Sequence, residues 1–197
     1  MSGQLTDDAL NQLFRDARTH THWLDAPITD ANIAAIYELA KMGPTSANQS
    51  PARFVWCRTD EAKARLSAIA AEGNKAKILA APVTVILGYD LDFHEQLPWL
   101  FPHTDARAWF TGDVDKRRES ALRNSALQGA YLILAARALG FDCGPMSGFD
   151  QDAATAAFFA DQPRVRADWI CSIGYGDPAP LHGRSPRPQF DVFNRLA

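Results

Sequence analysis

Apolar residues recur at helical spacing in the first third of the chain, each time after a residue that can cap a helix. Thr6 precedes a segment that we expect to be helical as far as Arg18. Thr29 precedes a second helix, which we expect to end at the Gly-Pro pair 43–44, with the glycine in a left-handed cap. Thr59 begins a third helix.

Apolar runs of strand length follow these helices. Residues 53–57, 83–87 and 169–175 are rich in Val, Ile, Phe and Trp, which is typical of strands. Between the last two runs, residues 119–139 are apolar on most sides, which predicts a central core helix that Gly140 terminates. The pattern predicts one α+β domain over all 197 residues.

Composition narrows the class of protein further. Apolar residues make up 47% and charged residues 22% of the chain, and the formal net charge is -3. No block of like charge is present, which argues against nucleic acid or an anionic membrane as the main partner. Residues 130–136 form the longest apolar run, too short for a membrane span, and residues 1–8 lack the pattern of a secretion signal.

Cysteine and histidine spacing point away from a metal protein. The three cysteines lie far apart, and the five histidines show no His-Glu-x-x-His spacing. We therefore expect no metal site, and we expect the cysteines to be small buried side chains of a reduced, cytoplasmic enzyme.

The loop at residues 43–51 reads Gly-Pro-Thr-Ser-Ala-Asn-Gln-Ser-Pro and lies between a predicted helix and a predicted strand. Its small hydroxyl and amide side chains, stiffened by two prolines, offer hydrogen-bond donors and acceptors to a planar, polar-edged ligand. A simple turn needs only two or three such residues. The loop therefore indicates a pocket wall, and the alternative is a long helix-to-strand connection.

Two basic segments suit an anionic ligand. Residues 18–22 combine a guanidinium, two imidazoles and two hydroxyls, and residues 181–188 combine one imidazole with two guanidiniums. Either segment could hold a phosphate. In the alternative interpretation, Arg18 complements the end of a helix and the second segment is a solvated basic tail.

Two further segments could approach the ring of a ligand. Asn74 and Lys77 share one face if their segment is helical, and the lysine could stabilise negative charge, although a solvated lysine is commoner. Residues 144–149 form a glycine-bracketed proline turn that allows close approach of the backbone, or else an ordinary turn. Gly-x-Gly-x-x-Gly and phosphate-loop patterns are absent from the sequence.

Together and in this order, the five segments resemble the nitroreductase family of FMN-dependent oxidoreductases. The family's Pro-Ser-Ser-x-Asn-x-Gln-Pro loop is similar to residues 44–51, its Asn-x-x-Lys step to residues 74–77, and its Pro-x-x-Gly-Phe turn to residues 145–149. The aromatic segment 101–110 is most similar to the malonic semialdehyde reductases of pyrimidine degradation. The resemblance implies a central mixed or antiparallel sheet flanked by helices, with the long apolar helix at the interface of a homodimer.

The resemblance also implies how FMN would be held at that interface. The phosphate would lie near Arg18, Thr19, His20, His182 and Arg184. The ring would lie near His22, Asn74, Lys77, Pro145, Met146, Ser147 and Gly148. The other subunit would contribute Pro44, Thr45, Ser46 and Asn48. The family often has other residues at the three histidine positions, and histidine makes the charge of such a site sensitive to pH.

The implied reaction is a ping-pong cycle in which NADH or NADPH gives hydride to flavin N5 and an acceptor then takes it. Lys77 would stabilise charge on the ring, and Arg107 would bind the carboxylate of malonic semialdehyde, which is reduced to 3-hydroxypropanoate. Two alternatives remain open. One is a general NAD(P)H-dependent nitro, quinone or enone reductase, and the other is a flavin-binding protein without turnover.

Overall fold

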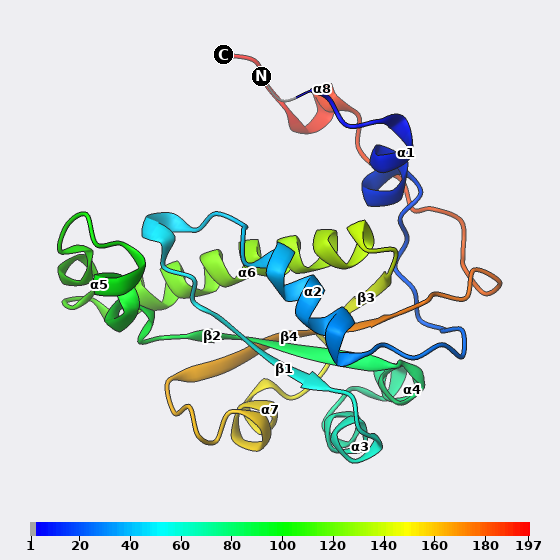
Figure 1. Cartoon of the computed structure of the whole chain (residues 1–197), viewed down its shortest axis with the longest axis horizontal. Coiled ribbons are helices and arrows are strands. Elements are labelled where there is room, and N and C mark those ends of the chain that lie inside the picture. Colours follow the sequence, from blue (N-terminus) through cyan, green and yellow to red (C-terminus); the bar gives the residue numbers. More distant parts are fainter. Residues whose placement is uncertain (1–2) are drawn as a thin grey trace.

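A computed structural model describes residues 3–197, and its centre is a four-stranded sheet (Figure 1). The strands lie in the order β1 (Ala52–Cys57), β2 (Val83–Asp90), β4 (Val165–Gly174) and β3 (Asp142–Met146). Each neighbouring pair is antiparallel. Of the two sheet types expected, the antiparallel one is therefore formed.

Helices cover both faces of this sheet. α2 (Asp30–Ala40) and α6 (Val114–Ala138) lie on one face, and α3 (Asp60–Ala68), α4 (Glu72–Ala80) and α7 (Gln151–Phe158) lie on the other (Figure 1). Alternate residues of a strand point to opposite faces of the sheet, so each strand contributes side chains to the hydrophobic core on either face. Thus Val83, Val85 and Cys171 join the core under α2 and α6, whereas Ile86 and Ile170 join the core under the other helices.

The described chain also contains seven short helical segments. They are α1 (Asp7–Leu10), η1 (Asn11–Arg15), η2 (Ser46–Asn48), η3 (Phe93–Gln96), α5 (Leu97–Leu100), η4 (Ala106–Phe110) and α8 (Phe190–Phe193). Among residues 3–197, no helix combines the length and apolar character needed to cross a bilayer.

The predicted helix caps at Thr29 and Thr59 are confirmed. The Thr29 hydroxyl accepts a bond from the Asn32 amide at 3.2 Å, and Asn32 Oδ1 accepts one from the Thr29 amide at 2.9 Å, which completes a capping box. The hydroxyl of Thr59 accepts a bond from the Ala62 amide at 3.2 Å. Local hydrogen bonds of this kind can be recognised in a sequence because both partners are near neighbours.

The first helix is shorter than predicted. Its regular part ends at Arg15, in a π-helical turn, and not at Arg18. The cause is a competing contact, because Thr19 forms a parallel bridge with Cys143 and the His20 amide donates to the Cys143 carbonyl at 3.0 Å. Residues 18–22 therefore run along the edge strand β3.

The long helix α6 differs from the prediction in two respects. It begins at Val114, five residues earlier than expected, because the Asp113 carboxylate caps the amides of Asp115 and Lys116. Nor is it an apolar core helix on all sides. Its buried stripe includes polar residues such as Asn124 and Gln128, while Leu122, Leu127 and Tyr131 are exposed.

Two turn predictions also need correction. Residues 144–146 belong to strand β3 and do not form a turn, and Pro145 is tolerated there because β3 is an edge strand. Gly43 does not adopt the left-handed conformation. It is small for another reason, because a Cβ atom at this position would lie 2.5 Å from Cγ of Tyr131. Gly140, in contrast, ends α6 with φ +83°, as predicted.

Candidate functional site

Three hollows follow one another along the N-terminal segment, β3 and α6. Their volumes are about 480, 90 and 390 Å³. The first and second share Thr19 and Thr21, and the second and third share Pro145 and Met146. The three hollows therefore adjoin one another, and we call them together the continuous pocket, with a cationic end, a middle part and an apolar groove.

The cationic end gathers basic side chains from three separate segments. It is lined by Arg18, His22, Arg137, His182, Arg184 and Arg187, and none of the described residues that line it is acidic. Arg18 donates to the His182 carbonyl at 2.5 Å, and Arg184 donates to the carbonyls of Arg15 and Ala17 at 2.6 and 2.9 Å. These cross-links hold the two predicted basic segments together. An excess of fixed guanidinium groups suits a dianion such as a phosphate.

Close packing on β3 fixes the segment between the cationic end and the middle part. A Cβ atom on Gly144 would lie 2.3 Å from the His20 carbonyl oxygen, so only glycine admits this approach. The side chain of His20 is 7% exposed, with Nε2 3.4 Å from Asp142 Oδ1 and Nδ1 3.3 Å from the Asp177 carbonyl. His20 therefore borders the middle hollow and does not line the cationic end, where the sequence placed it.

In the middle part, Asn74 and Lys77 share one face of α4, as predicted. Lys77 Nζ donates to Asn74 Oδ1 at 3.1 Å, and Asn74 Nδ2 donates to the Gly148 carbonyl at 3.0 Å. This relay directs the ammonium group of Lys77, which lines the middle hollow next to Pro145 and Met146. A flexible lysine thereby becomes an oriented positive charge.

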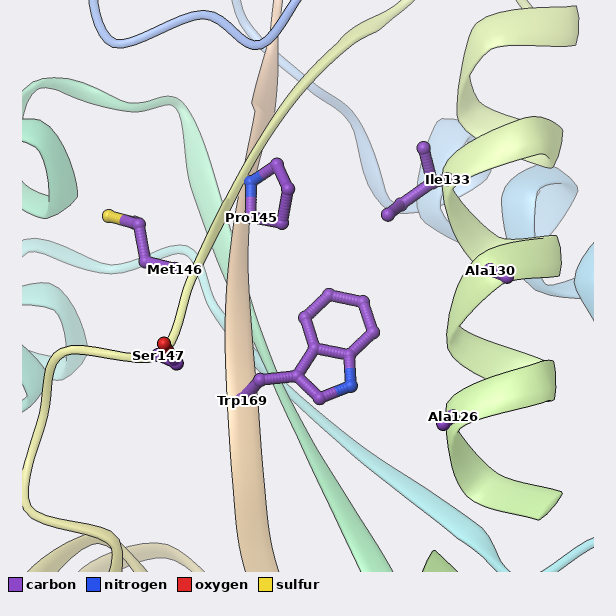
Figure 2. Close-up of a pocket in the computed structure, with 7 residues that line it drawn as sticks. All are labelled: Ala126, Ala130, Ile133, Pro145, Met146, Ser147 and Trp169. Atoms are coloured by element: carbon purple, nitrogen blue, oxygen red, sulfur yellow. The ribbon is translucent and has the colours of Figure 1, made fainter. Parts of the chain in front are cut away.

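The apolar groove runs between β3 and α6 (Figure 2). Pro145, Met146 and Ser147 line one side and Trp169 lies between them and the helix. Ala126, Ala130 and Ile133 of α6 line the opposite side. Small residues on the helix leave a flat space that suits a planar ring system.

The loop with Pro44, Thr45, Ser46 and Asn48 lies elsewhere in its own chain. The Ser46 amide donates to Asn124 Oδ1 at 2.8 Å, thirteen residues before Arg137 on α6, which corresponds to about 20 Å along the helix axis. None of the four residues lines the continuous pocket. The loop is therefore not part of the pocket of its own chain.

Backbone strain marks the same loop. Ala47 and Asn48 have φ 49° and Ser50 has φ 38°, which are costly values for residues with a Cβ atom. Two residues of α6 hold this strained conformation in place. Ser120 accepts a hydrogen bond from the side chain of Gln49, which is fully buried. Gln128 accepts a hydrogen bond from the backbone amide of Ala52 at 2.9 Å. Strain maintained by buried polar contacts is typical of functional loops.

Arg107 lies in the aromatic segment that covers the first turns of α6. Its Nε and one terminal nitrogen both donate to the Glu95 carboxylate at 2.8 Å. These bonds lower the pKa of Glu95 and raise that of Arg107. The charge of Arg107 is thus already balanced, and the residue does not line the continuous pocket.

Sequence reasoning missed several residues of the pocket, among them Arg137 and Trp169. Arg137 had the appearance of an ordinary basic residue at a helix end, and Trp169 that of a core strand residue. Strand alternation would have placed Trp169 on the α6 face with Cys171 and Ile173, but no local signal reveals the neighbouring groove.

Comparison with known proteins identifies the family. The sequence profile of the nitroreductase family matches residues 14–177. A protein of Burkholderia lata, named "Putative NADH dehydrogenase/NAD(P)H nitroreductase", is 58% identical over 98% of each chain. A protein of the same name from Stenotrophomonas maltophilia is 55% identical over the full length of both chains. This chain therefore belongs to the nitroreductase family.

Solved structures show the same fold. A structure from Exiguobacterium sibiricum, described as a "putative nitroreductase in complex with FMN", superimposes with a TM-score of 0.86 at 21% identity and covers 100% of both chains. A gut-bacterial enone reductase superimposes with a TM-score of 0.84 at 19% identity, over 98% of this chain and 99% of its own. The antiparallel sheet flanked by helices is thus the nitroreductase-like fold.

Proposed function

We propose that this protein is an NAD(P)H-dependent oxidoreductase that holds FMN in the continuous pocket and reduces malonic semialdehyde. The carrying observation is the order of the pocket's parts. A cationic end, an oriented lysine and an apolar groove follow one another, and they would match the phosphate of FMN, the N1 and O2 side of its ring next to the ribityl chain, and the body of the ring. Relatives named as NAD(P)H nitroreductases and a fold neighbour in complex with FMN support the assignment.

The described residues fit this cofactor. Arg18 and Arg184 would hold the phosphate, together with His182 and Thr19 at the same end. His22, expected near the ring, also lines this end and would face the phosphate instead. The groove beside Pro145, Met146 and Ser147 takes the ring. The chemistry that FMN supplies when bound is transfer of hydride from NADH or NADPH to an acceptor.

The chain's own residues position this chemistry. Lys77 would set a positive charge beside the polar edge of a bound ring and would favour negative charge there. Asn74 keeps that ammonium in place and is itself held by the Gly148 carbonyl. The mostly apolar lining of the groove would pack against a bound ring and offers few hydrogen-bond partners to water there.

The site is completed by a second copy of the chain. Pro44, Thr45, Ser46 and Asn48 line no part of their own chain's pocket, and the resemblance assigns this loop to the pocket of the partner. The exposed apolar side chains of α6, namely Leu122, Leu127 and Tyr131, provide surface for that contact.

Malonic semialdehyde is the proposed acceptor because of the resemblance in the aromatic segment 101–110. Its carboxylate would replace Glu95 as the partner of Arg107. A second candidate, an uncharged nitro, quinone or enone acceptor, is favoured by the apolar lining of the groove and by the balanced charge of Arg107.

The first test concerns the cofactor and turnover. Purified protein is expected to be yellow, to release FMN when denatured, and to oxidise NAD(P)H when an acceptor is present. Protein that cannot be loaded with FMN contradicts the proposed function. A yellow protein that oxidises no NAD(P)H with any acceptor would instead be a flavin-binding protein.

The second test separates the acceptors. Steady-state kcat/KM is measured for malonic semialdehyde and for a nitroaromatic, with native protein and with Arg107→Ala. The proposal expects higher kcat/KM for the semialdehyde and a raised KM for that substrate alone in the variant. Preference for the nitroaromatic, with no effect of Arg107→Ala, supports the second candidate.

A further inference from the structure

Arg137 connects α6 to the cationic end of the pocket. It lies in the last turn of the helix, and its carbonyl accepts a bond from Gln12 Nε2 at 2.7 Å. One terminal nitrogen of its guanidinium donates to the Leu13 carbonyl at 3.1 Å. Backbone and side chain are thus both anchored to the N-terminal helical segment, and the guanidinium has a defined position.

The Nε donor of this guanidinium is buried and has no partner in the described chain. Buried charged donors nearly always find an acceptor, because an unmade bond costs the whole desolvation free energy. The helix dipole favours a positive charge at the C-terminal end of α6, which explains why a basic residue is found at this position. It does not explain why Nε lacks a hydrogen-bond partner.

The surroundings of Arg137 offer donors in place of an acceptor. The side chains that line the same hollow include Arg18, His182 and Arg184, and those two arginines already donate to backbone carbonyls. An anionic ligand in this hollow would supply the acceptor that Arg137 Nε lacks.

We propose that Arg137 binds the flavin phosphate through its Nε–H and makes the pocket selective for a phosphorylated flavin. The inference rests on the proposed function and adds a residue from a third segment of the chain. Ile133, which lines the ring groove, lies one turn before Arg137, about 6 Å along the same helix. One rigid element therefore sets the spacing between ring and phosphate. Riboflavin would fill the groove but leave Nε unpaired.

Binding of FMN and of riboflavin to the flavin-free protein tests this role. Native protein is titrated with each flavin by calorimetry, in parallel with Arg137→Met and Arg137→Lys. Loss of a charge-assisted hydrogen bond is expected to weaken FMN binding by about 10- to 100-fold in Arg137→Met. Riboflavin binding is expected to stay unchanged. Arg137→Lys keeps the charge without the planar fork and should lose affinity for FMN to a smaller degree.

Arg123→Met is the matched control, since Arg123 is an exposed arginine of the same helix that pairs with Glu119. It is expected to bind both flavins as the native protein does. If Arg137→Met weakens the binding of FMN and of riboflavin equally, the role of Arg137 is purely structural. If FMN binding is unchanged, Arg137 has no role in binding the phosphate. Either result overturns the inference and leaves the proposed function intact. Native protein that binds neither flavin overturns both.

Discussion

At the scale of single residues, the oriented ammonium of Lys77 is the feature most directly tied to catalysis. Replacing Lys77 with Met removes the charge beside the ring but keeps most of the side-chain volume. We expect kcat at saturating FMN to fall by about 100-fold, the usual effect of losing one preorganised electrostatic group. The measurement is steady-state turnover per bound flavin.

Lys75 provides the control for this prediction. It lies on the same helix, is exposed, and pairs with Glu72 at 2.8 Å. Lys75→Met should turn over at the native rate. If both variants lose activity equally, the helix and not the charge of Lys77 is responsible.

His94 is a buried titratable residue outside the pocket. Arg117 donates to His94 Nε2 at 3.2 Å, so the neutral ring carries its proton on Nδ1, which has no partner in the described chain. Burial, and then the charge of Arg117, lower the pKa of His94, although Glu95 and Asp92 act in the opposite direction. The folded state therefore resists protonation at this position.

This lowered pKa predicts a loss of stability in mild acid. Below about pH 6.5, the ordinary pKa of histidine, His94 is protonated in the unfolded chain but stays neutral in the folded chain. Unfolding therefore becomes more favourable as the pH falls. The slope from this residue is at most about 1.4 kcal/mol per pH unit. Urea unfolding at pH 7.5 and 5.0 should show a smaller difference for His94→Gln than for native protein. Identical pH dependence in the two proteins would contradict the prediction.

At the scale of elements, α6 and β4 approach closely at Gly129. A Cβ atom there would lie 2.1 Å from Trp169 Cζ2 and 3.0 Å from Leu87 Cδ1. Glycine costs a helix interior about 1 kcal/mol relative to alanine, so its presence in α6 reflects this packing. The glycine lets the indole of Trp169 occupy the floor of the groove.

Gly129→Ala is therefore expected to destabilise the protein in spite of better helix propensity. Overpacking costs about 1–3 kcal/mol, which exceeds the gain in propensity and leaves a net loss of about 1 kcal/mol. Urea denaturation measures it. Gly73→Ala on α4 is the control, because nothing lies within 4 Å of its Cβ position, and it should be neutral or stabilising. A stabilised Gly129→Ala would show that the indole has room to move.

At the scale of the whole molecule, the separation of the strained loop from the pocket leads to a test of the dimer. Asn48→Ala changes the loop and Lys77→Met changes the pocket, and each variant alone is expected to be defective. Random pairing of the two should make half of the dimers mixed, each with one intact site, so about one quarter of native activity returns. Activity that stays at the level of the single variants, or a protein that remains monomeric, contradicts sharing between subunits.

The sequence predicted the parts of the fold that depend on near neighbours. The caps at Thr29 and Thr59, the strand runs and the shared face of Asn74 and Lys77 all follow from contacts a few residues apart. The prediction placed the end of the first helix too late. The backbone of residues 19 and 20 pairs with Cys143, which is more than a hundred residues away in the sequence, and this pairing replaces helical hydrogen bonds.

By itself, the sequence determined the elements, the basic and polar segments and the resemblance to the nitroreductase family. Only the tertiary structure decided which of these segments meet. The antiparallel order β1-β2-β4-β3 sets residues 18–22 beside β3, joins Lys77 to Gly148 and brings Arg137 and Trp169 into one pocket with them. The same packing leaves Pro44, Thr45, Ser46 and Asn48 out of the lining of that pocket. These contacts depend on how strands and helices that are far apart in the chain pack together. A local sequence pattern does not predict such packing.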